Sequence, residues 1–345
     1  MALPCAVLLA LALTWWLWPQ PDPLYTVTIL PHLGGGYTMP HSINDRGQIA
    51  GVSRRADGTG HLFLWQRDKG MQDLGPVVIN SVHINDVGQI AGTMRDPNDE
   101  NRAFIWDPNS GRRMLPTLGG DHARACGINN LGQVVGEAET DLEVGHAFVW
   151  DALHGIRDLT PSDTRDTRTW SINDAGQIGV FTGDGSLLFQ TGQADHLTSE
   201  PSPVVGLPYI NNNGQVVGLS RRVKGRIDIL VWHPDSGTKK VAQLKGTFPG
   251  APQINDAGQV FYWQALRPRF TLFGRRFLTA PPANYLWDPQ KGSISLDARV
   301  PTQRGAALSI ADLNKHGCLV GAVKSDNASR IQGVLIEPIP ERWEK

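Results

Sequence analysis

One short phrase recurs seven times along this chain of 345 residues, with the pattern Ile-Asn-Asp-x-Gly-Gln-Ile or a close variant. The copies begin at Ile43, Ile84, Ile128, Ile172, Ile210, Ile254 and Leu313. The first five intervals are 41, 44, 44, 38 and 44 residues, and the last is 59. A period in the low forties that holds several short strands is typical of the blades of a β-propeller.

Each copy carries the residues of a tight turn between two strands. Asn favours the first position of a type I turn, where its side chain can bond the backbone ahead, and Gly suits the fourth, left-handed position. Apolar residues on both sides predict a hairpin. We therefore assign structural turn roles to Asn44, Gly47, Asn85, Gly88, Asn129, Gly132, Asn173, Gly176, Asn211, Gly214, Asn255, Gly258, Asn314 and Gly317.

A second apolar run follows each turn. In four repeats it ends in a Trp that lies 21 residues after the repeat Asn: Trp65, Trp106, Trp150 and Trp232. These runs are continuously apolar, which indicates that both faces are covered, as when a blade packs between two neighbours. A Gly and a further short apolar segment complete four strands per repeat, which we name A to D. Repeat four departs from the pattern, with Phe189 at the Trp position.

The two ends of the chain complement each other. Residues 30–35 copy residues 115–120, which close repeat two, so residues 25–30 predict a D strand that precedes the first A strand. Residues 333–336 predict a C strand with no D strand after it. We therefore expect an all-β, seven-bladed β-propeller of four-stranded antiparallel blades, closed by pairing of the N-terminal strand with the C-terminal blade. An open solenoid is the alternative.

Residues 2–18 are almost wholly apolar, and the first Lys or Arg of the chain is Arg46. Such a run is near the lower limit for a bilayer span and the upper limit for a signal-peptide core. We divide the chain into a signal peptide or N-terminal membrane anchor (1–18), a Pro-rich linker (19–24), the propeller (25–338) and a C-terminal tail (339–345). The protein is expected to be extracytoplasmic, either secreted or tethered to a membrane through residues 2–18. A buried segment of a cytoplasmic protein is the alternative.

With these residues in hand, the chain resembles the bacterial extracellular HAF-repeat family. The triplet His146-Ala147-Phe148, with weaker copies at 61–63 and 102–104, matches the sequence that names this family, and the Ile-Asn-x-x-Gly-Gln phrase is the other half of its pattern. The resemblance covers about residues 25–338. It implies an exported β-propeller-like protein and supplies no catalytic residue.

No catalytic signature stands out. The chain lacks the G-x-S-x-G, H-E-x-x-H and P-loop sequences, so we assign no catalytic, cofactor-binding or metal residue and expect no cofactor. The Asn-Asp turns could offer oxygens to Ca²⁺, but one turn per blade, spread around a ring, is not expected to converge into a site of six to eight ligands. His41, His83 and His122 occupy different register positions, so we expect packing or surface roles for them.

Repeat six contains the most distinctive insertion, since 32 residues separate Asn255 from Trp287. Basic and aromatic residues together can hold a sugar, an anionic glycan, a lipid surface or a nucleic acid strand. An elongated hairpin packed on the propeller is the alternative, and the net charge of −1 argues against nucleic acid. The candidate ligand-binding residues are Arg267, Arg269, Phe270, Phe273, Arg275 and Arg276.

The two faces of a propeller differ in what they carry. With strand A innermost, the A–B and C–D turns share one face, and the B–C and D–A loops share the other. The B–C loops are charged and vary between repeats, and variable loops on a rigid scaffold usually carry binding. We expect a monomeric scaffold that binds a protein or glycan through its B–C and D–A loop face. The alternatives are an enzyme acting on extracellular polysaccharide at the central channel, as hydrolase or lyase, and a structural envelope component.

Overall fold

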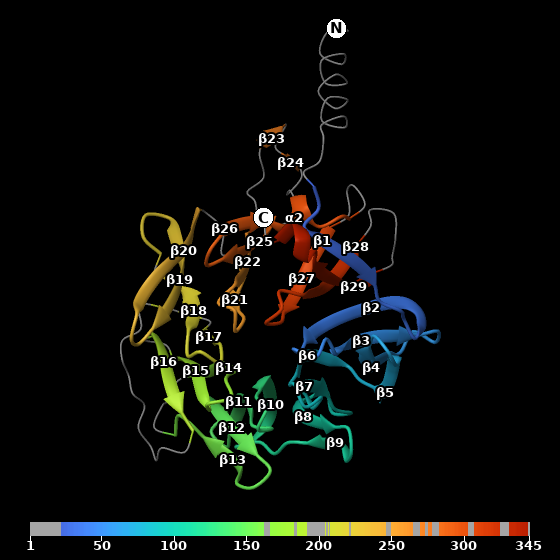
Figure 1. Cartoon of the computed structure of the whole chain (residues 1–345). Helices are drawn as coiled ribbons and strands as arrows, with labels where there is room; N and C mark the ends of the chain where they lie inside the picture. The colour runs from blue at the N-terminus through green and yellow to red at the C-terminus, as the bar shows by residue number, and fades with distance from the viewer. Residues whose placement is uncertain are drawn as a thin grey trace, which may run out of the picture.

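The computed structural model describes residues 22–161, 166–182, 185–191, 204, 206, 208–220, 222–245, 250–264, 270–272, 275–277, 283–302, 307–324 and 331–343. Within these residues the chain is almost entirely strand, and the sheets are arranged as blades around a central axis (Figure 1). The predicted all-β, seven-bladed antiparallel propeller is confirmed.

The strands of each blade follow one another in sequence, with the first strand nearest the hub. The first three blades are β2 (Gly34–Ile43), β3 (Ile49–Arg55), β4 (Gly60–Gln66) and β5 (Gly70–Pro76); β6 (Ile79–Ile84), β7 (Ile90–Arg95), β8 (Asn101–Asp107) and β9 (Gly111–Met114); and β10 (Gly119–Ile128), β11 (Val134–Thr140), β12 (Gly145–Asp151) and β13 (Gly155–Asp158). The described strands of the next three are β14 (Arg168–Ile172), β15 (Gln177–Thr182) and β16 (Gly185–Gln190); β17 (Tyr209–Ile210), β18 (Val216–Leu219), β19 (Arg226–His233) and β20 (Gly237–Lys245); and β21 (Gln253–Ile254), β22 (Val260–Gln264), β25 (Ala283–Asp288) and β26 (Gly292–Ser295).

Blade seven joins the two ends of the chain. It consists of β27 (Ala307–Leu313), β28 (Leu319–Lys324), β29 (Ile331–Pro338) and β1 (Tyr25–Ile29), in that order. β1 runs antiparallel to β29, with Val27 opposite Ile336 and Ile29 opposite Val334. Figure 1 shows the blue β1 beside the red β29. The predicted closure is therefore confirmed, and about 310 residues of intervening chain are held as a ring by this pairing.

The core lies between neighbouring blades, where the apolar C strands predicted from the sequence are buried. Phe63, Phe104 and Phe148 occupy equivalent positions in β4, β8 and β12 and are fully buried. Each ring lies over a Gly of the adjacent B strand. A Cβ on Gly136 would come within 2.7 Å of the Phe148 ring and would collide with the carbonyl oxygen of Arg124. The small B-strand residue thus makes room for the aromatic ring and for the A strand at the same point.

The His of the His-Ala-Phe triplet connects strands C and D. His61 Nδ1 lies 2.7 Å from Asp73 Oδ1, and His146 Nδ1 lies 2.7 Å from Asp158 Oδ2, each pair 12 residues apart in sequence. Both His side chains are buried. Burial alone would raise the pKa of Asp73, but hydrogen bonds from Gly75, His61 and Arg55 outweigh it and hold the pKa below its ordinary value. The triplet therefore supports the outer half of its blade.

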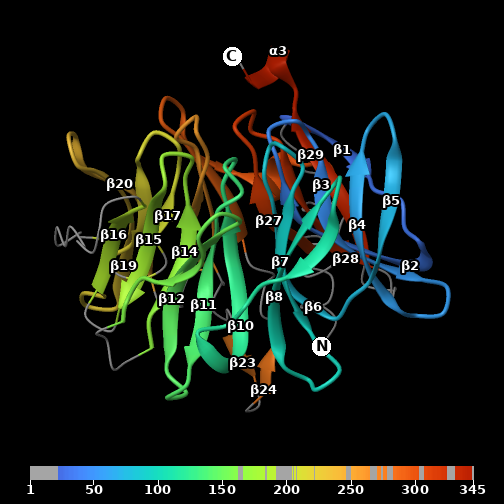
Figure 2. The ribbon, with the colours of Figure 1, turned by 90° about the horizontal axis from the view of Figure 1, so that it is seen from below.

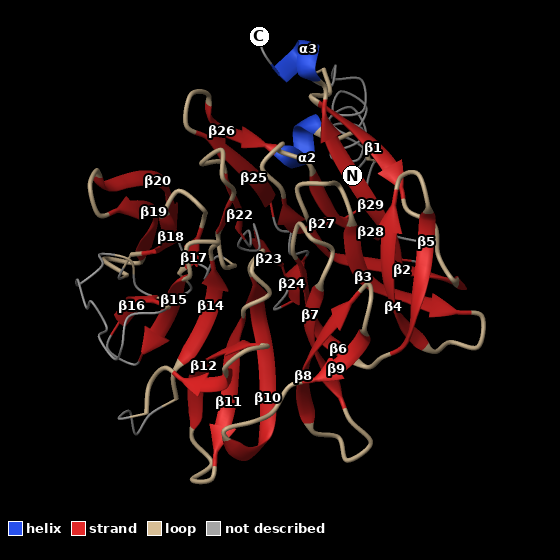
Figure 3. Cartoon of the chain, turned by 60° about the horizontal axis from the view of Figure 1, so that its bottom comes forward, coloured by secondary structure: helices blue, strands red, loops and turns tan. Residues whose placement is uncertain are grey.

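Two short helices complete the described structure, α2 (Leu296–Arg299) after β26 and α3 (Pro340–Trp343) after β29 (Figure 3). Within the described ranges, no helix is long and apolar enough to cross a membrane. The prediction of an extracytoplasmic protein, secreted or anchored by its N-terminal segment, is corrected on this finding. Residues 2–18, on which that prediction rested, lie outside the described residues.

Candidate functional site

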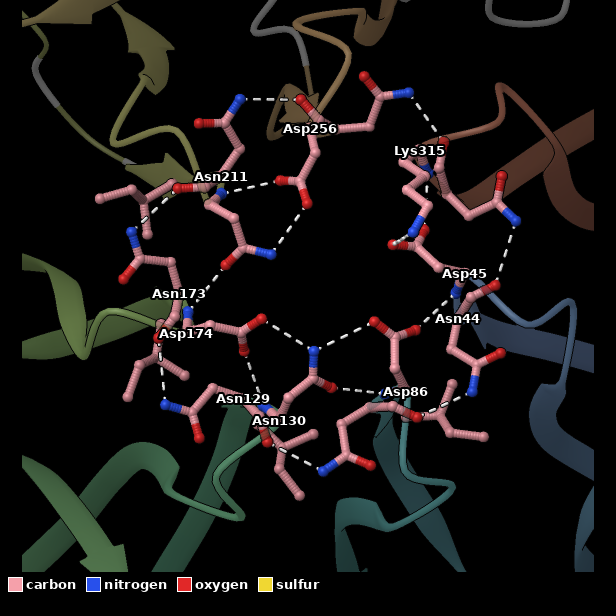
Figure 4. Close-up of a pocket in the computed structure, with 18 of the residues that line it drawn as sticks. Asn44, Asp45, Asp86, Asn129, Asn130, Asn173, Asp174, Asn211, Asp256 and Lys315 are labelled. Atoms are coloured by element: carbon pink, nitrogen blue, oxygen red, sulfur yellow. Dashed lines mark hydrogen bonds and ion pairs between the residues drawn. The ribbon is translucent and has the colours of Figure 1, made fainter.

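The seven A–B turns meet at the hub and line one pocket of about 180 Å³ (Figure 4). The turns lie around the axis, one from each blade. Strand A is innermost in every blade, so the ends of seven A strands are brought together at the axis. Two consecutive polar residues from each turn face this pocket: the repeat Asn and the residue that follows it.

The repeat Asn residues form a closed circle of hydrogen bonds. Each donates its Nδ2 to the backbone carbonyl of the equivalent Asn in the next blade, over distances of 2.8 to 3.1 Å. The last of these bonds runs from Asn314 back to Asn44, so the circle crosses the closure seam. All seven side chains are buried. The conserved chemistry of the phrase is thus explained by contacts between blades as well as within each turn.

Each Asn also builds its own turn. Asn129 Oδ1 accepts the backbone N–H of Gln133 at 2.9 Å, and its Nδ2 donates to Gln133 Oε1 at 2.8 Å. The same pair of bonds recurs in the other blades except blade seven, where Cys318 replaces the Gln and only the backbone bond forms. The Gln of the phrase is therefore an acceptor for a buried amide donor, as burial requires.

The residues after each Asn form a second, incomplete circle. The backbone N–H of each donates to the side-chain oxygen of its counterpart in the next blade, for example Asp45 to Asp86 at 2.8 Å and Asp86 to Asn130 at 2.7 Å. Six such bonds run around the hub. The circle is interrupted after Asp256, because Lys315 offers no acceptor. Lys315 Nζ instead lies 3.3 Å from Asp45 Oδ2.

Four carboxylates therefore surround the hub pocket, and each already serves as an acceptor. Asn130 Nδ2 donates to Asp86 Oδ2 and Asp174 Oδ2, and Asn212 Nδ2 donates to Asp256 Oδ2 at 2.9 Å. In the part of the chain that the structure describes, no group of three or more His, Cys, Asp or Glu is arranged to hold a metal ion. The polar side chains of neighbouring blades thus satisfy one another's hydrogen-bonding groups and hold the blades together.

Behind the hub, burial strongly shifts the pKa values of titratable residues on the A strands. Burial lowers the pKa of His41, and burial followed by repulsion from His41 lowers the pKa of His83 to about 4. Burial raises the pKa of Asp312 to about 6, although its carboxylate accepts bonds from Ser42 Oγ at 2.8 Å and from the Ile43 N–H at 3.0 Å. Asp312 thus ties blade seven to blade one, a role that our sequence reading missed.

The three His residues singled out in the sequence do not form one group. The pKa of His83 responds to His41, so those two lie in the same neighbourhood. His122, which lies on β10, instead accepts the backbone N–H of Asn101 at 3.2 Å. The pair His41 and His83 is kept neutral at physiological pH by burial.

The face that carries the B–C and D–A loops, which we call the loop face, differs in backbone conformation from the face that carries the A–B and C–D turns, which we call the turn face. In the described A–B and C–D turns, every left-handed position is Gly: Gly47, Gly88, Gly132, Gly176, Gly214, Gly258, Gly317, Gly70, Gly111, Gly155, Gly237 and Gly292. Only three described non-Gly residues have positive φ: Asp99 (66°), Glu143 (59°) and Lys224 (48°). All three lie in B–C loops, which connect β7 to β8, β11 to β12 and β18 to β19.

Blade one provides the internal reference for these loops. Its B–C turn has the bond Gly58 N–H to Arg55 O at 3.0 Å, and the matching bonds run from Asp99 to Asp96 at 3.0 Å and from Glu143 to Thr140 at 3.1 Å. The turn is the same, but a charged residue stands where blade one has Gly. A left-handed conformation costs such a residue on the order of 1 kcal/mol.

Exposed apolar residues accompany the left-handed charged ones. Leu142 directly precedes Glu143 and is 79% exposed, and Val223 directly precedes Lys224 and is 64% exposed. Val78, in the connection from β5 to β6, is 63% exposed on the same face. Apolar tips beside charges on protruding loops form a mixed surface of the kind that protein partners bury.

The predicted blade-six loop is only partly within the described residues. Phe270, Arg275 and Arg276 lie in a hairpin of β23 (Phe270–Leu272) and β24 (Arg275–Phe277), in which Thr271 pairs with Arg276. Arg267, Arg269 and Phe273 lie outside them. Figure 2 shows this hairpin on the side of the ring opposite α3. It therefore extends from the loop face, as a B–C insertion should.

Comparisons with known proteins identify the fold alone. No family model matches the chain, and no curated protein matches it. Among solved structures, it is similar to an oligogalacturonate lyase in complex with manganese, with 9% identity and a TM-score of 0.60 over 94% of this chain and 99% of that one. It is also similar to the WD40 β-propeller domain of Doa1, with 17% identity and a TM-score of 0.53 over 92% and 99%. TolB from Acinetobacter baumannii has 12% identity and a TM-score of 0.49, and the match covers 73% of this chain and 62% of that structure.

Proposed function

We propose that this protein is a non-catalytic binding propeller that holds a protein or glycan ligand against its B–C and D–A loop face. The observation that carries the proposal is the placement of Asp99, Glu143 and Lys224 in left-handed positions of the B–C loops. For Asp99 and Glu143, blade one shows that Gly serves the same turn, whereas Lys224 lies in a different turn, in which Val223 and Arg226 exchange backbone hydrogen bonds. Asp99 forms an exposed ion pair with Arg95, a contact that contributes at most about 1 kcal/mol. A charged side chain kept in a left-handed position despite its conformational cost is explained when that side chain also contacts a ligand.

The contacts at the hub favour a ligand site on the loop face over a catalytic site in the central channel. Its carboxylates accept backbone and amide N–H groups from neighbouring blades, so they are committed to holding the ring. Its pocket of about 180 Å³ is smaller than the ~300 Å³ at which small-molecule sites usually begin. The polysaccharide-acting enzyme at the central channel, considered from the sequence, therefore has less support than the binding scaffold.

Protein is the better supported ligand class. Leu142 and Val223 would be buried by a partner, while Glu143 and Lys224 beside them have opposite charges and would set its orientation. One observation favours glycan as the second candidate. The Arg54 guanidinium lies 4.7 Å from the centre of the Tyr37 ring on the loop side of blade one. A cation paired with an aromatic ring is a combination that can hold an acidic sugar.

The test uses substitutions that relax the backbone while removing the side chains. The triple variant Asp99→Gly, Glu143→Gly and Lys224→Gly should be as stable as wild type, or more stable by about 0.5 kcal/mol per site. We would screen the full chain on a glycan array and by crosslinked capture, and then measure the affinity of each purified hit. The triple variant is expected to bind at least tenfold more weakly.

The matched control alters exposed apolar residues on the turn face. Leu131 and Leu153 are 70% and 84% exposed there, and Leu131→Ser with Leu153→Ser should leave the affinity unchanged. Equal binding by the triple glycine variant and wild type would contradict the proposal. A further variant trimmed of residues 265–280 tests the blade-six insertion, because unchanged binding would remove that insertion from the ligand site.

A further inference from the structure

A second cavity lies at the seam where the two ends of the chain meet, away from the hub. It has a volume of about 490 Å³, is open to solvent, and is lined by residues of β26 and the turn before it, α2, α3 and the residue before β1. Figure 3 shows α2 and α3 close together beside β1. We call it the seam pocket and define it by Leu24, Lys291, Ile294, Arg299, Arg342 and Trp343.

Three cations face this pocket, and the charge of one of them, Lys291, also attracts the nearby Asp288 carboxylate. In the described residues, no Asp or Glu lines it, and none forms an ion pair with Lys291, Arg299 or Arg342. Asp288 accepts the backbone N–H of Lys291, and its carboxylate is also bound by Gln259. Asp297 of α2 is bound to Asn284. The neighbouring carboxylates are thus occupied by other groups.

Backbone bonds hold the two guanidinium groups near each other. Arg299 donates to the carbonyl oxygen of Asp22 at 3.0 Å, and Arg342 donates to that of Pro23 at 3.0 Å. These carbonyls belong to consecutive residues. Each bond uses one of the five donors of an Arg side chain, so most of the N–H groups stay available. Two such groups in one place suit the oxygens of a carboxylate or a phosphate.

The wall of the seam pocket also contains apolar and aromatic residues. Leu24 and Ile294 line the pocket, and the Trp343 ring makes an edge contact with Tyr25 at 5.4 Å between centroids. The Lys291 ammonium lies 5.0 Å from the centre of the Trp343 ring, which holds it beside the pocket. The volume falls within the range of ~300 to 1,000 Å³ found for small-molecule sites.

We propose that the seam pocket binds a small organic anion, with a carboxylate or phosphate group held by Arg299, Arg342 and Lys291 and an apolar body against Leu24 and Ile294. The bound anion would contact blade six, the N-terminal segment and the C-terminal helix at once. It therefore stabilises the closure of the ring, because it binds only when both chain ends are in place. This site is independent of the ligand bound on the loop face.

The experiment uses the full chain and four probes: phenyl phosphate, phenylacetate, the neutral 2-phenylethanol, and inorganic phosphate. At ten times its dissociation constant, an aromatic anion should raise Tm by about 2 °C. The neutral alcohol and inorganic phosphate should each bind at least tenfold more weakly than the better aromatic anion. Preference for phenyl phosphate assigns a phosphate ligand, and preference for phenylacetate assigns a carboxylate.

Three variants decide whether the seam pocket is responsible. Arg299→Ala with Arg342→Ala should weaken binding at least tenfold, and Lys291→Met, which keeps the aliphatic stem, should weaken it at least threefold. Arg113→Ala removes an exposed cation that lies over Trp150 on blade three and should change nothing. The proposal fails if neither aromatic anion binds saturably at millimolar concentration, if the alcohol or inorganic phosphate binds equally well, or if Lys291→Met and the double variant both bind like wild type.

Discussion

The two faces of this propeller solve the same backbone problem in different ways. On the turn face, each left-handed position of the described A–B and C–D turns holds Gly, the residue that adopts this conformation at least cost. On the loop face, the B–C turns of blades two, three and five hold Asp99, Glu143 and Lys224 instead. Because blade one holds Gly58 in the matching B–C turn, the turn geometry by itself does not require the charged side chains of Asp99 and Glu143.

The side-chain contacts reinforce this division. On the turn face, buried Asn side chains and Asp carboxylates bond from blade to blade around the hub, and one of these bonds spans the closure seam. Exposed apolar residues occur on both faces, Leu142 and Val223 on the loop face and Leu131 and Leu153 on the turn face. The buried polar network around the hub holds the ring together from the turn face.

The largest expected effect concerns the hub. Asn129→Ala should lower the free energy of unfolding by about 3 kcal/mol, because it leaves the backbone N–H and the side-chain oxygen of Gln133 without their partner and removes the bond to the Asn173 carbonyl in the next blade. Denaturant unfolding measures this loss. Asn98→Ala in the exposed B–C turn of blade two is the matched control and should stay within about 0.5 kcal/mol of wild type. Equal effects at the two sites would break the distinction between the faces.

The next effect depends on pH and concerns Asp312, a buried carboxylate behind the hub whose pKa is strongly raised. Its pKa is raised to about 6 in the folded protein, above the ordinary value of 3.8, so the folded state binds more protons between these values. The stability it contributes is present below pH 4 and is lost as pH rises through 6. From pH 4 to pH 7, wild type should lose about 2 kcal/mol relative to Asp312→Asn. A difference that does not vary with pH would contradict this assignment.

Two opposite substitutions in blade three measure the free-energy cost of placing a non-Gly residue in the left-handed conformation. Gly155 has φ of 74° and an added Cβ would meet no atom within 4 Å, so Gly155→Glu should cost about 1 kcal/mol through conformation alone. Glu143→Gly on the other face should instead stabilise by about 0.5 kcal/mol. Thermal unfolding of both variants provides the measurement. A stability loss in Glu143→Gly would show that its side chain supports the fold.

The smallest expected effect is at the interruption of the second circle. Lys315→Asn supplies an acceptor for the Asp256 N–H and copies Asn130, at the expense of an exposed ion pair with Asp45. The net change should be a stabilisation of about 0.5 kcal/mol, since a hydrogen bond is gained and a weak surface pair is lost. A clear loss of stability would mean that the attraction between the Lys315 charge and the hub carboxylates stabilises the protein more than the added hydrogen bond does.

Much of the architecture follows from short-range patterns. The Asn and Gly of each turn, the apolar C strands and the seven-fold period all repeat within a few residues, where turn chemistry and burial act locally. The closure was also predictable, because residues 25–30 copy the segment that ends repeat two. Lys315 could have been noticed as well, since it stands where the other repeats have Asp or Asn.

The sequence by itself determined the number of blades, the turn residues and the way in which the two ends combine, because each of these depends on a local period. Only the tertiary structure decided that Asp86 accepts a bond from Asp45 one blade away, and that Leu24, Arg299 and Arg342 line one pocket. These features require distances between residues that are 41 to more than 300 positions apart. Ring closure creates them, and no local pattern records them.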